Sequence, residues 1–369
     1  MASQSNRPLY AYVGNFSQTE EQVRAKADGV YVFRIDPDTF AWEPIQVIGD
    51  CPQPSFLVVD AARRYLYVAH LSDQVAGLTG GAASAYAIDP TSGKLTFLNR
   101  QPTGGEGPCF VSIDASGKFL LLANYISGSA ATFAIQGDGS LGPVAGFVQH
   151  AGSGPNQARQ EGPHAHSITP DPSNRFALVA DLGADRVFVY RLDPDRGKLE
   201  PNDPPYAAFK PGAGPRHLAF HPNGRFVYVA NELDSTMTVL AWDGERGALE
   251  QIQNVSTVPE SWKAINYPAD IHFGPSGKHV YVSNREHDSL AIYAVSEETG
   301  RVSTVGWEPT QGSYPRHFTF CPMEGRLIVA NQNAGQVFAF RVDEATGKLS
   351  PLGPVAEVTG AACVQMVTW

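Results

Sequence analysis

Six charged or polar residues of this chain share a position that suits acid–base chemistry and anion binding. Each directly follows a proline or the asparagine that ends an apolar run, and they are His164, Arg216 and Arg316 after proline, and Glu232, Arg285 and Gln332 after asparagine. Guanidinium groups bind carboxylate and phosphate through two parallel hydrogen bonds. A histidine or carboxylate can act as a general base when its pKa lies near the working pH. The recurrence of these residue types at equivalent places indicates one shared site, provided that the fold brings the places together.

A repeated turn phrase identifies the elements that would position these residues. An apolar run, a turn rich in Asp, Glu and Gly, and an apolar residue that opens another run recur seven times: Ile35–Trp42, Ile88–Leu95, Ile135–Leu141, Leu192–Leu199, Trp242–Leu249, Val295–Val302 and Val342–Leu349. The copies return roughly every 50 residues, a period typical of propeller blades or large solenoid repeats.

A second repeat lies between the copies of the first. It has a proline, an alternating strand, a polar turn and a second strand, and its six complete copies start at Pro54, Pro108, Pro163, Pro215, Pro268 and Pro315. A seventh copy is split, because residues 9–15 resemble the second strand alone and residues 361–367 the first strand alone. Each unit therefore supplies four short strands with period-2 alternation. The sequence predicts an all-β fold, a seven-bladed β-propeller whose C-terminal strand pairs with the N-terminal one and closes the ring.

The order of strands within a blade predicts where a site would lie. Neighbouring strands are antiparallel, so the start of the innermost strand and the end of the second strand lie on one face. The long connections, residues 15–29, 70–84, 146–162 and 256–267, fall on the same face, and long loops are where binding residues are usually carried. We therefore expect the residues that follow the prolines and the asparagines to ring the mouth of the central channel. Structural salt bridges are the alternative explanation for the cluster, since Arg216 and Glu232 share a blade and are separated by a single hairpin.

Composition narrows the class of protein. The 369 residues are 43% hydrophobic, with 36 Gly and 28 Pro, and the repeats use nearly all of them, which predicts one domain over residues 1–369 with residues 1–8 as a flexible tail. A net charge of −10 argues against nucleic acid or an anionic membrane as a partner. The first residues lack the apolar core of a signal peptide, and no run approaches the length of a membrane span, so we expect a cytoplasmic protein. Four cysteines at unrelated spacings are expected to be buried apolar residues.

Four segments resemble the lactonase propellers, a family that includes the propeller-type 6-phosphogluconolactonases and the fungal carboxy-cis,cis-muconate cyclases. The segments are QEGPHAHSITPDPSNRFALVADLGADRV (160–187), GPRHLAFHPNGRFVYVANEL (214–233), VYVSNR (280–285) and YPRHFTF (314–320). The resemblance covers essentially the whole chain and implies a seven-bladed propeller that acts on a small-molecule lactone. It implies a site made of His164, Arg216, Glu232 and Arg285.

The chemistry of the groups suggests a role for each of these residues. We expect His164 to be the base, with Glu232 orienting it or replacing it, and Arg216 to stabilise the oxyanion. Arg285 and Arg316 would clamp an anionic group of a sugar-derived lactone such as 6-phosphoglucono-1,5-lactone. His166, Gln332 and Asp181 are further candidates for substrate binding, although Asp181 also fits a turn-capping role.

Other readings of the sequence remain open. His164 and His166, two apart on a strand, are too few to specify a metal, so we expect no metal and no cofactor. His217, His272 and His317 are expected to be packed between inner strands. The alternatives to hydrolysis are the cyclisation of carboxy-cis,cis-muconate, in which an alkene is protonated and a carboxylate adds to it, and a propeller that only binds a partner protein. A binding platform should show exposed aromatic residues at the mouth, and only the 256–267 loop, with Trp262 and Tyr267, offers them.

Overall fold

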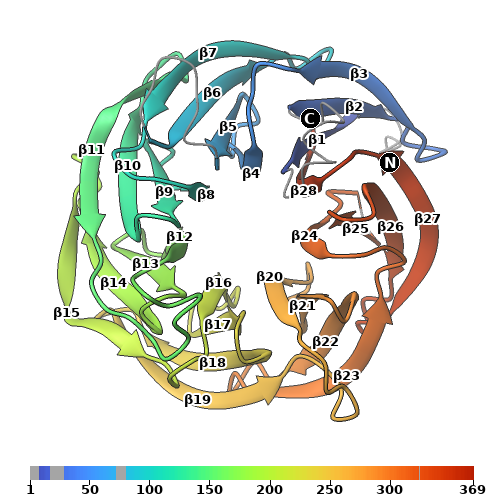
Figure 1. Cartoon of the computed structure of the whole chain (residues 1–369). Coiled ribbons are helices and arrows are strands. Elements are labelled where there is room, and N and C mark those ends of the chain that lie inside the picture. Colours follow the sequence, from blue (N-terminus) through green and yellow to red (C-terminus); the bar gives the residue numbers. More distant parts are fainter. Residues whose placement is uncertain (1–7, 17–28, 72–79, 324) are drawn as a thin grey trace.

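The apolar runs of the chain form 28 strands in seven four-stranded antiparallel sheets, which stand around a central channel (Figure 1). The structure is a computed structural model and describes residues 8–16, 29–71, 80–323 and 325–369. These residues contain no helix, so none of them forms a helix that could cross a membrane. The prediction of a seven-bladed all-β propeller is confirmed.

Four concentric rings of strands build the blades. The innermost strands are β28 (Ala361–Thr368), β4 (Pro54–Val59), β8 (Pro108–Ile113), β12 (Ala165–Pro170), β16 (Pro215–Phe220), β20 (Tyr267–Phe273) and β24 (Pro315–Phe320). The second ring is β1 (Leu9–Asn15), β5 (Tyr65–His70), β9 (Phe119–Asn124), β13 (Phe176–Asp181), β17 (Phe226–Asn231), β21 (His279–Arg285) and β25 (Arg326–Asn331). The third ring is β2 (Val30–Ile35), β6 (Ala82–Ile88), β10 (Ser129–Ile135), β14 (Arg186–Leu192), β18 (Thr236–Asp243), β22 (Ser289–Val295) and β26 (Gln336–Val342). The outer ring is β3 (Trp42–Ile48), β7 (Leu95–Pro102), β11 (Leu141–Gln149), β15 (Leu199–Ala208), β19 (Ala248–Ser256), β23 (Val302–Pro309) and β27 (Leu349–Glu357).

The split unit closes the ring as predicted. β28 pairs with β1 along its whole length, from Leu9 opposite Thr368 to Asn15 opposite Ala361, and supplies the inner strand of the first blade (Figure 1). Trp369 then packs edge-on against Tyr10, with ring centroids 5.6 Å apart. The inner edge of β1 is therefore hydrogen bonded to β28, so the first blade has no unpaired strand edge at the point where the ring closes.

The glycine of the turn phrase explains why that phrase repeats. In six blades it adopts a positive φ in the turn between the third and outer strands, and an added Cβ would meet the ring that begins the second strand of the preceding blade. At Gly300 the φ is +70°, and the nearest atom of Phe226 would lie 2.4 Å from that Cβ. Two residues after Phe226, the hydroxyl group of Tyr228 donates a hydrogen bond to the carbonyl oxygen of Gly300, which adds to the contact between the blades. The turn thus serves as an interblade lock, and only glycine fits it without strain.

The cysteines, the terminal tail and the long connections were also predicted from the sequence, and the structure describes only some of them. All four cysteines are buried, as expected. Residues 1–7 of the proposed tail and most of the 15–29 and 70–84 connections lie outside the described residues. The 146–162 connection begins later than predicted, because β11 extends to Gln149, and it runs on to the start of β12 at Ala165.

Candidate active site

A bulge at the start of every inner strand positions the residues at the channel mouth. In β16, Pro215 pairs with Asn231 and His217 with Ala230, so Arg216 between them has no partner in the register. A bulge of this kind re-aims the side chain of the extra residue. The equivalent residues of the seven blades are Ala362, Ser55, Cys109, His166, Arg216, Ala269 and Arg316.

A cavity of about 440 Å³ lies at this mouth. Its lining residues come from all seven blades and from the connections beside them, and they are Phe16, Leu71, Cys109, Tyr125, Arg159, His166, Glu232, Tyr267, Arg285, Tyr314 and Arg316. The volume is within the range of small-molecule sites. Three guanidinium groups and one carboxylate give the lining a surplus of two positive charges, which suits an anionic ligand.

Glu232 is the centre of the charged network. One of its oxygens accepts from Nε of Arg216 at 2.8 Å and from Arg285 at 2.6 Å, and the other accepts from Arg159. Burial alone would raise the pKa of this carboxyl group, but Arg285, Arg216 and Arg159 together hold it well below its usual range. Glu232 is therefore ionised at neutral pH and fixes the position of the arginines around it.

Arg316 differs from the other arginines of the lining. Its residue is 8% exposed, and its guanidinium group makes no hydrogen bond or ion pair with any described residue. The group lies over the ring of Phe16, 5.1 Å from the ring centroid. Burial and the nearby charge of Arg285 lower its pKa. A buried cation without a carboxylate partner is costly, and a bound anion would supply the missing charge.

His166 is the histidine of the cavity. Burial, with Arg216 as the next cause, lowers its pKa well below the usual range, so its imidazole is neutral. Its Nδ1 lies 3.6 Å from Sγ of Cys109, and its ring packs edge-on against Tyr125. Nε2 has no hydrogen-bond partner among the described residues, which leaves a nitrogen available to a ligand or water.

The structure does not place His164 on the cavity wall. Nδ1 of its ring lies 2.9 Å from the Tyr125 carbonyl oxygen and Nε2 lies 3.1 Å from Glu161, while the ring stacks on that of Tyr125. The prediction treated Pro163 as equivalent to Pro215, but Ala165 is the residue that pairs with the end of the second strand, opposite Asp181. Two extra residues therefore separate this proline from the bulge, and His166 takes the place that was predicted for His164.

Three other predicted residues support the cavity without lining it. Arg216 is 1% exposed and, besides its bond to Glu232, it donates to the Ala269 carbonyl oxygen at 2.5 Å. Asp181 accepts from the backbone N–H groups of His164 and Ala184 and pairs with His150, which agrees with the turn-capping alternative. Gln332 donates to the Phe16 carbonyl oxygen at 3.1 Å.

Several lining residues were missed by the sequence reasoning. Phe16, Leu71 and Tyr125 each follow the last residue of a second-ring strand, the same position that led to Glu232 and Arg285, but only charged and polar residues were considered there. Tyr314 precedes the proline of its inner strand. Tyr267 holds the same position in the neighbouring blade and was predicted at the mouth only as an aromatic residue of the binding-platform alternative. Arg159 belongs to the connection before β12, where no repeat pattern indicates the direction of a side chain.

The fold and the cavity define a seven-bladed propeller with one cationic small-molecule site at the mouth of its channel. Comparison with known proteins extends this conclusion: a family model described as "Lactonase, 7-bladed beta-propeller" matches residues 10–366, and the chain belongs to that family. The family resemblance predicted from the sequence is confirmed.

Named relatives and solved structures agree with this membership. The chain is 34% identical to a 6-phosphogluconolactonase of Bacillus subtilis, over 82% of this chain and 85% of the relative. It is 31% identical to a 6-phosphogluconolactonase of Formosa agariphila, over 82% and 83%. The solved structure of a periplasmic gluconolactonase from Pseudomonas aeruginosa has a TM-score of 0.88 at 30% identity, covering 98% of this chain and 99% of that one.

Proposed function

We propose that this protein is a lactonase, a carboxylic-ester hydrolase that opens an anionic sugar lactone such as 6-phosphoglucono-1,5-lactone to the open acid. The observation that carries the proposal is the buried guanidinium group of Arg316, which faces a cationic cavity without a carboxylate partner. The similarity to 6-phosphogluconolactonases supports the same reaction class.

Hydrolysis needs a water molecule activated against the lactone carbonyl carbon. Neutral His166 can take a proton from that water through Nε2 while the water oxygen forms the new C–O bond. The ring C–O bond then breaks, and the proton passes to the alkoxide, so that the product is a hydroxy acid. The charge of Glu232 favours the imidazolium that forms on His166 for part of this cycle.

The arginines divide into two groups by their contacts. Arg285 and Arg159 are both bound to Glu232, so their positions are fixed before substrate arrives, and fixed donors stabilise a developing oxyanion at little reorganisation cost. Arg216 holds Glu232 from behind and acts as a positioning residue. Arg316 has its guanidinium group available for a phosphate or carboxylate of the substrate.

The proposal is tested by measuring turnover of purified protein on 6-phosphogluconolactone, gluconolactone and carboxymuconolactone, each corrected for spontaneous hydrolysis. We expect the phosphorylated lactone to be the best substrate. Arg316→Ala should raise KM for that substrate with little change in kcat, because a ground-state contact is lost. The same variant should leave KM and kcat for the unphosphorylated lactone nearly unchanged.

Arg34→Ala provides a matched control, because Arg34 is an exposed arginine whose partner, Glu43, is exposed as well. This variant should behave as the wild type on all three substrates. Turnover of carboxymuconolactone alone would instead support the cyclase alternative, and absence of turnover on every lactone would contradict the proposal. A location in the cytoplasm also stays a prediction, since the Pseudomonas relative is a periplasmic protein. Cell fractionation tests this location.

A further inference from the structure

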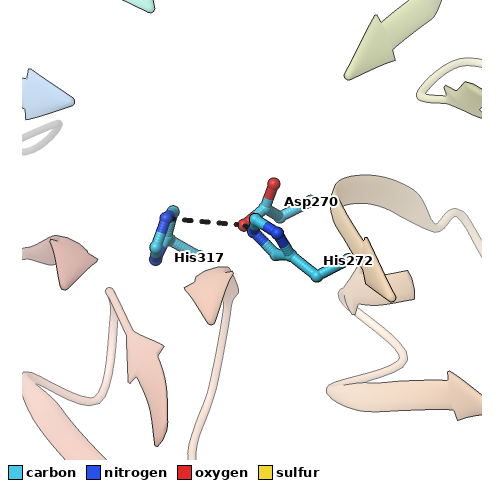
Figure 2. Close-up of side chains that lie close together, drawn as sticks. All are labelled: Asp270, His272 and His317. Atoms are coloured by element: carbon cyan, nitrogen blue, oxygen red, sulfur yellow. Dashed lines mark hydrogen bonds and ion pairs between the residues drawn. The ribbon is translucent and has the colours of Figure 1, made fainter. Parts of the chain in front are cut away.

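A second cluster of ionisable side chains lies further along the inner strands than the cavity. Asp270 and His272 of β20 and His317 of β24 each offer one ligand atom, and these atoms all lie within 4.8 Å of one another. Figure 2 shows the His317 ring on one side of the Asp270 carboxylate, with the His272 ring close to the same carboxylate. Oδ2 of Asp270 lies 2.9 Å from Nε2 of His272 and 3.6 Å from Nε2 of His317. Neither the proposed reaction nor the cavity uses these residues.

His317 points at this cluster with an unsatisfied atom. The residue is 1% exposed, and its Nε2 is buried without a hydrogen-bond partner among the described residues. A buried polar atom of this kind usually has an ion or a water molecule as its partner. Nδ1 of the same ring accepts a hydrogen bond from the Val364 N–H group at 3.3 Å. This long bond is lost when an ion binds Nε2, because the ring proton then lies on Nδ1.

The Asp270 carboxylate can bind a cation through one of its two oxygens. Oδ1 of Asp270 is occupied by Nδ1 of His217 at 2.9 Å, and the Asp270 N–H group donates to Ser283. These bonds fix the carboxylate so that Oδ2 faces the two histidines. Hydrogen-bonded outer partners of this type orient the ligands of metal sites.

The cluster does not line the cavity, but His217 connects the two. The ring of His217 packs on Phe56 and Phe110 and edge-on against His166, and its Nε2 lies 3.1 Å from a guanidinium nitrogen of Arg216. Phe56 also packs on His317. The side chain of His272 is 39% exposed, which provides a path for an ion from solvent.

We propose that Asp270, His272 and His317 form a binding site for one divalent transition-metal ion of the zinc class, independent of the lactonase function. Two imidazoles and one carboxylate are a donor set that zinc accepts, with ligand distances of about 2.0–2.2 Å and a water in the fourth position. Ligand atoms around a tetrahedral ion of this size are about 3.3 Å apart. The 3.6 Å separation needs little change, and the 2.9 Å separation opens slightly as the ion replaces the direct hydrogen bond.

The ion would connect two neighbouring blades. Asp270 and His272 belong to the blade of β20–β23, and His317 to that of β24–β27. A ligand that binds only the folded state stabilises that state in proportion to the logarithm of its concentration. The site therefore acts as a clip between blades and takes no part in lactone opening.

The test uses full-length protein freed of metal with a chelator and then titrated with Zn²⁺ by calorimetry and with Co²⁺ by visible absorption. We expect one ion per chain and a higher melting temperature with Zn²⁺. His272→Ala should weaken binding by more than about 100-fold, beyond what the loss of an outer partner costs. This variant should fold, because the His272 side chain is partly exposed.

His287→Ala is the matched control, since His287 is another partly buried histidine that hydrogen bonds to Ser289, outside the cluster. It should bind Zn²⁺ as the wild type does. The proposal is overturned when wild-type protein binds neither ion, or when His272→Ala binds Zn²⁺ as tightly as wild type. Turnover should survive chelation, and turnover that is lost with EDTA and restored by zinc would overturn the assignment as an interblade clip.

Discussion

A carboxylate that accepts hydrogen bonds from three guanidinium groups is a weak base, because each positive charge stabilises its ionised form. Glu232 is in this position, with Arg159, Arg216 and Arg285 around it and a pKa well below the usual range. Both of its oxygens accept hydrogen bonds from arginines, so neither is free to take a proton from water. We therefore assign Glu232 to holding the arginines in place, and the proton transfer to His166, which lines the cavity with a neutral imidazole.

The choice between two histidines leads to a prediction at the residue scale. His166→Asn should lower kcat on the best lactone by about 100- to 10,000-fold, the usual contribution of a general base. His164→Asn should change kcat only a few-fold, because His164 does not line the cavity and both its ring nitrogens have protein partners. Steady-state kinetics of both variants, with circular dichroism to verify folding, make the comparison.

The opposite order of effects would restore the role that the sequence alone suggested for His164. That suggestion rested on aligning Pro163 with the prolines of the other blades, whereas the pairing of β12 with β13 puts His166 at the equivalent position. Counting back from the polar turn after the inner strand gives the observed register, because Asp171 in this blade is equivalent to His221 in the copy that starts at Pro215. The direction of Arg159, by contrast, depends on a loop without a repeat and could not be read from the sequence.

At the scale of the elements, two features recur in the blades. The bulge at the start of the inner strand turns one residue toward the mouth, and the glycine of the turn phrase receives an aromatic or histidine ring from the preceding blade. The spacing of prolines and glycines made the blades predictable. The bulge itself was not predicted, because an extra unpaired residue leaves the alternation of a short strand almost unchanged.

Gly300 tests the interblade lock. Gly300→Ala should destabilise the protein by about 1–3 kcal/mol through overpacking against Phe226, with about 1 kcal/mol more for a side chain at positive φ. Gly306→Ala, in β23 of the same blade, should be nearly neutral, because nothing lies within 4 Å of its added Cβ. Urea unfolding of both variants measures the difference, and equal midpoints would contradict the lock.

At the scale of the whole molecule, the ring depends on pairing between the two ends of the sequence. Ala361, Cys363 and Val364 of β28 are fully buried against the rest of the ring. The split repeat predicted this closure, since the sequence contains seven turn phrases but only six complete strand pairs. The repeats in the sequence therefore predicted the blades and the ring closure, but they did not predict which residues line the cavity.

Deletion of residues 361–369 should remove the inner strand of the first blade and expose the edge of β1. We expect aggregated protein or a markedly lower melting temperature, measured by light scattering and thermal unfolding. A synthetic peptide of the same residues should restore part of the stability, since an open sheet edge accepts an added strand. A truncated protein that melts like the full chain would show that the closure contributes nothing.

The position of β28 also has a consequence for biosynthesis. The first blade receives β1, β2 and β3 from the beginning of the chain, but its inner strand leaves the ribosome after those of all six other blades. Until then the inner edge of β1 has no partner strand. Six blades can form in the order of translation, whereas the first blade to be started is the last that can be finished, and during synthesis its edge is the one most exposed to pairing with another nascent chain.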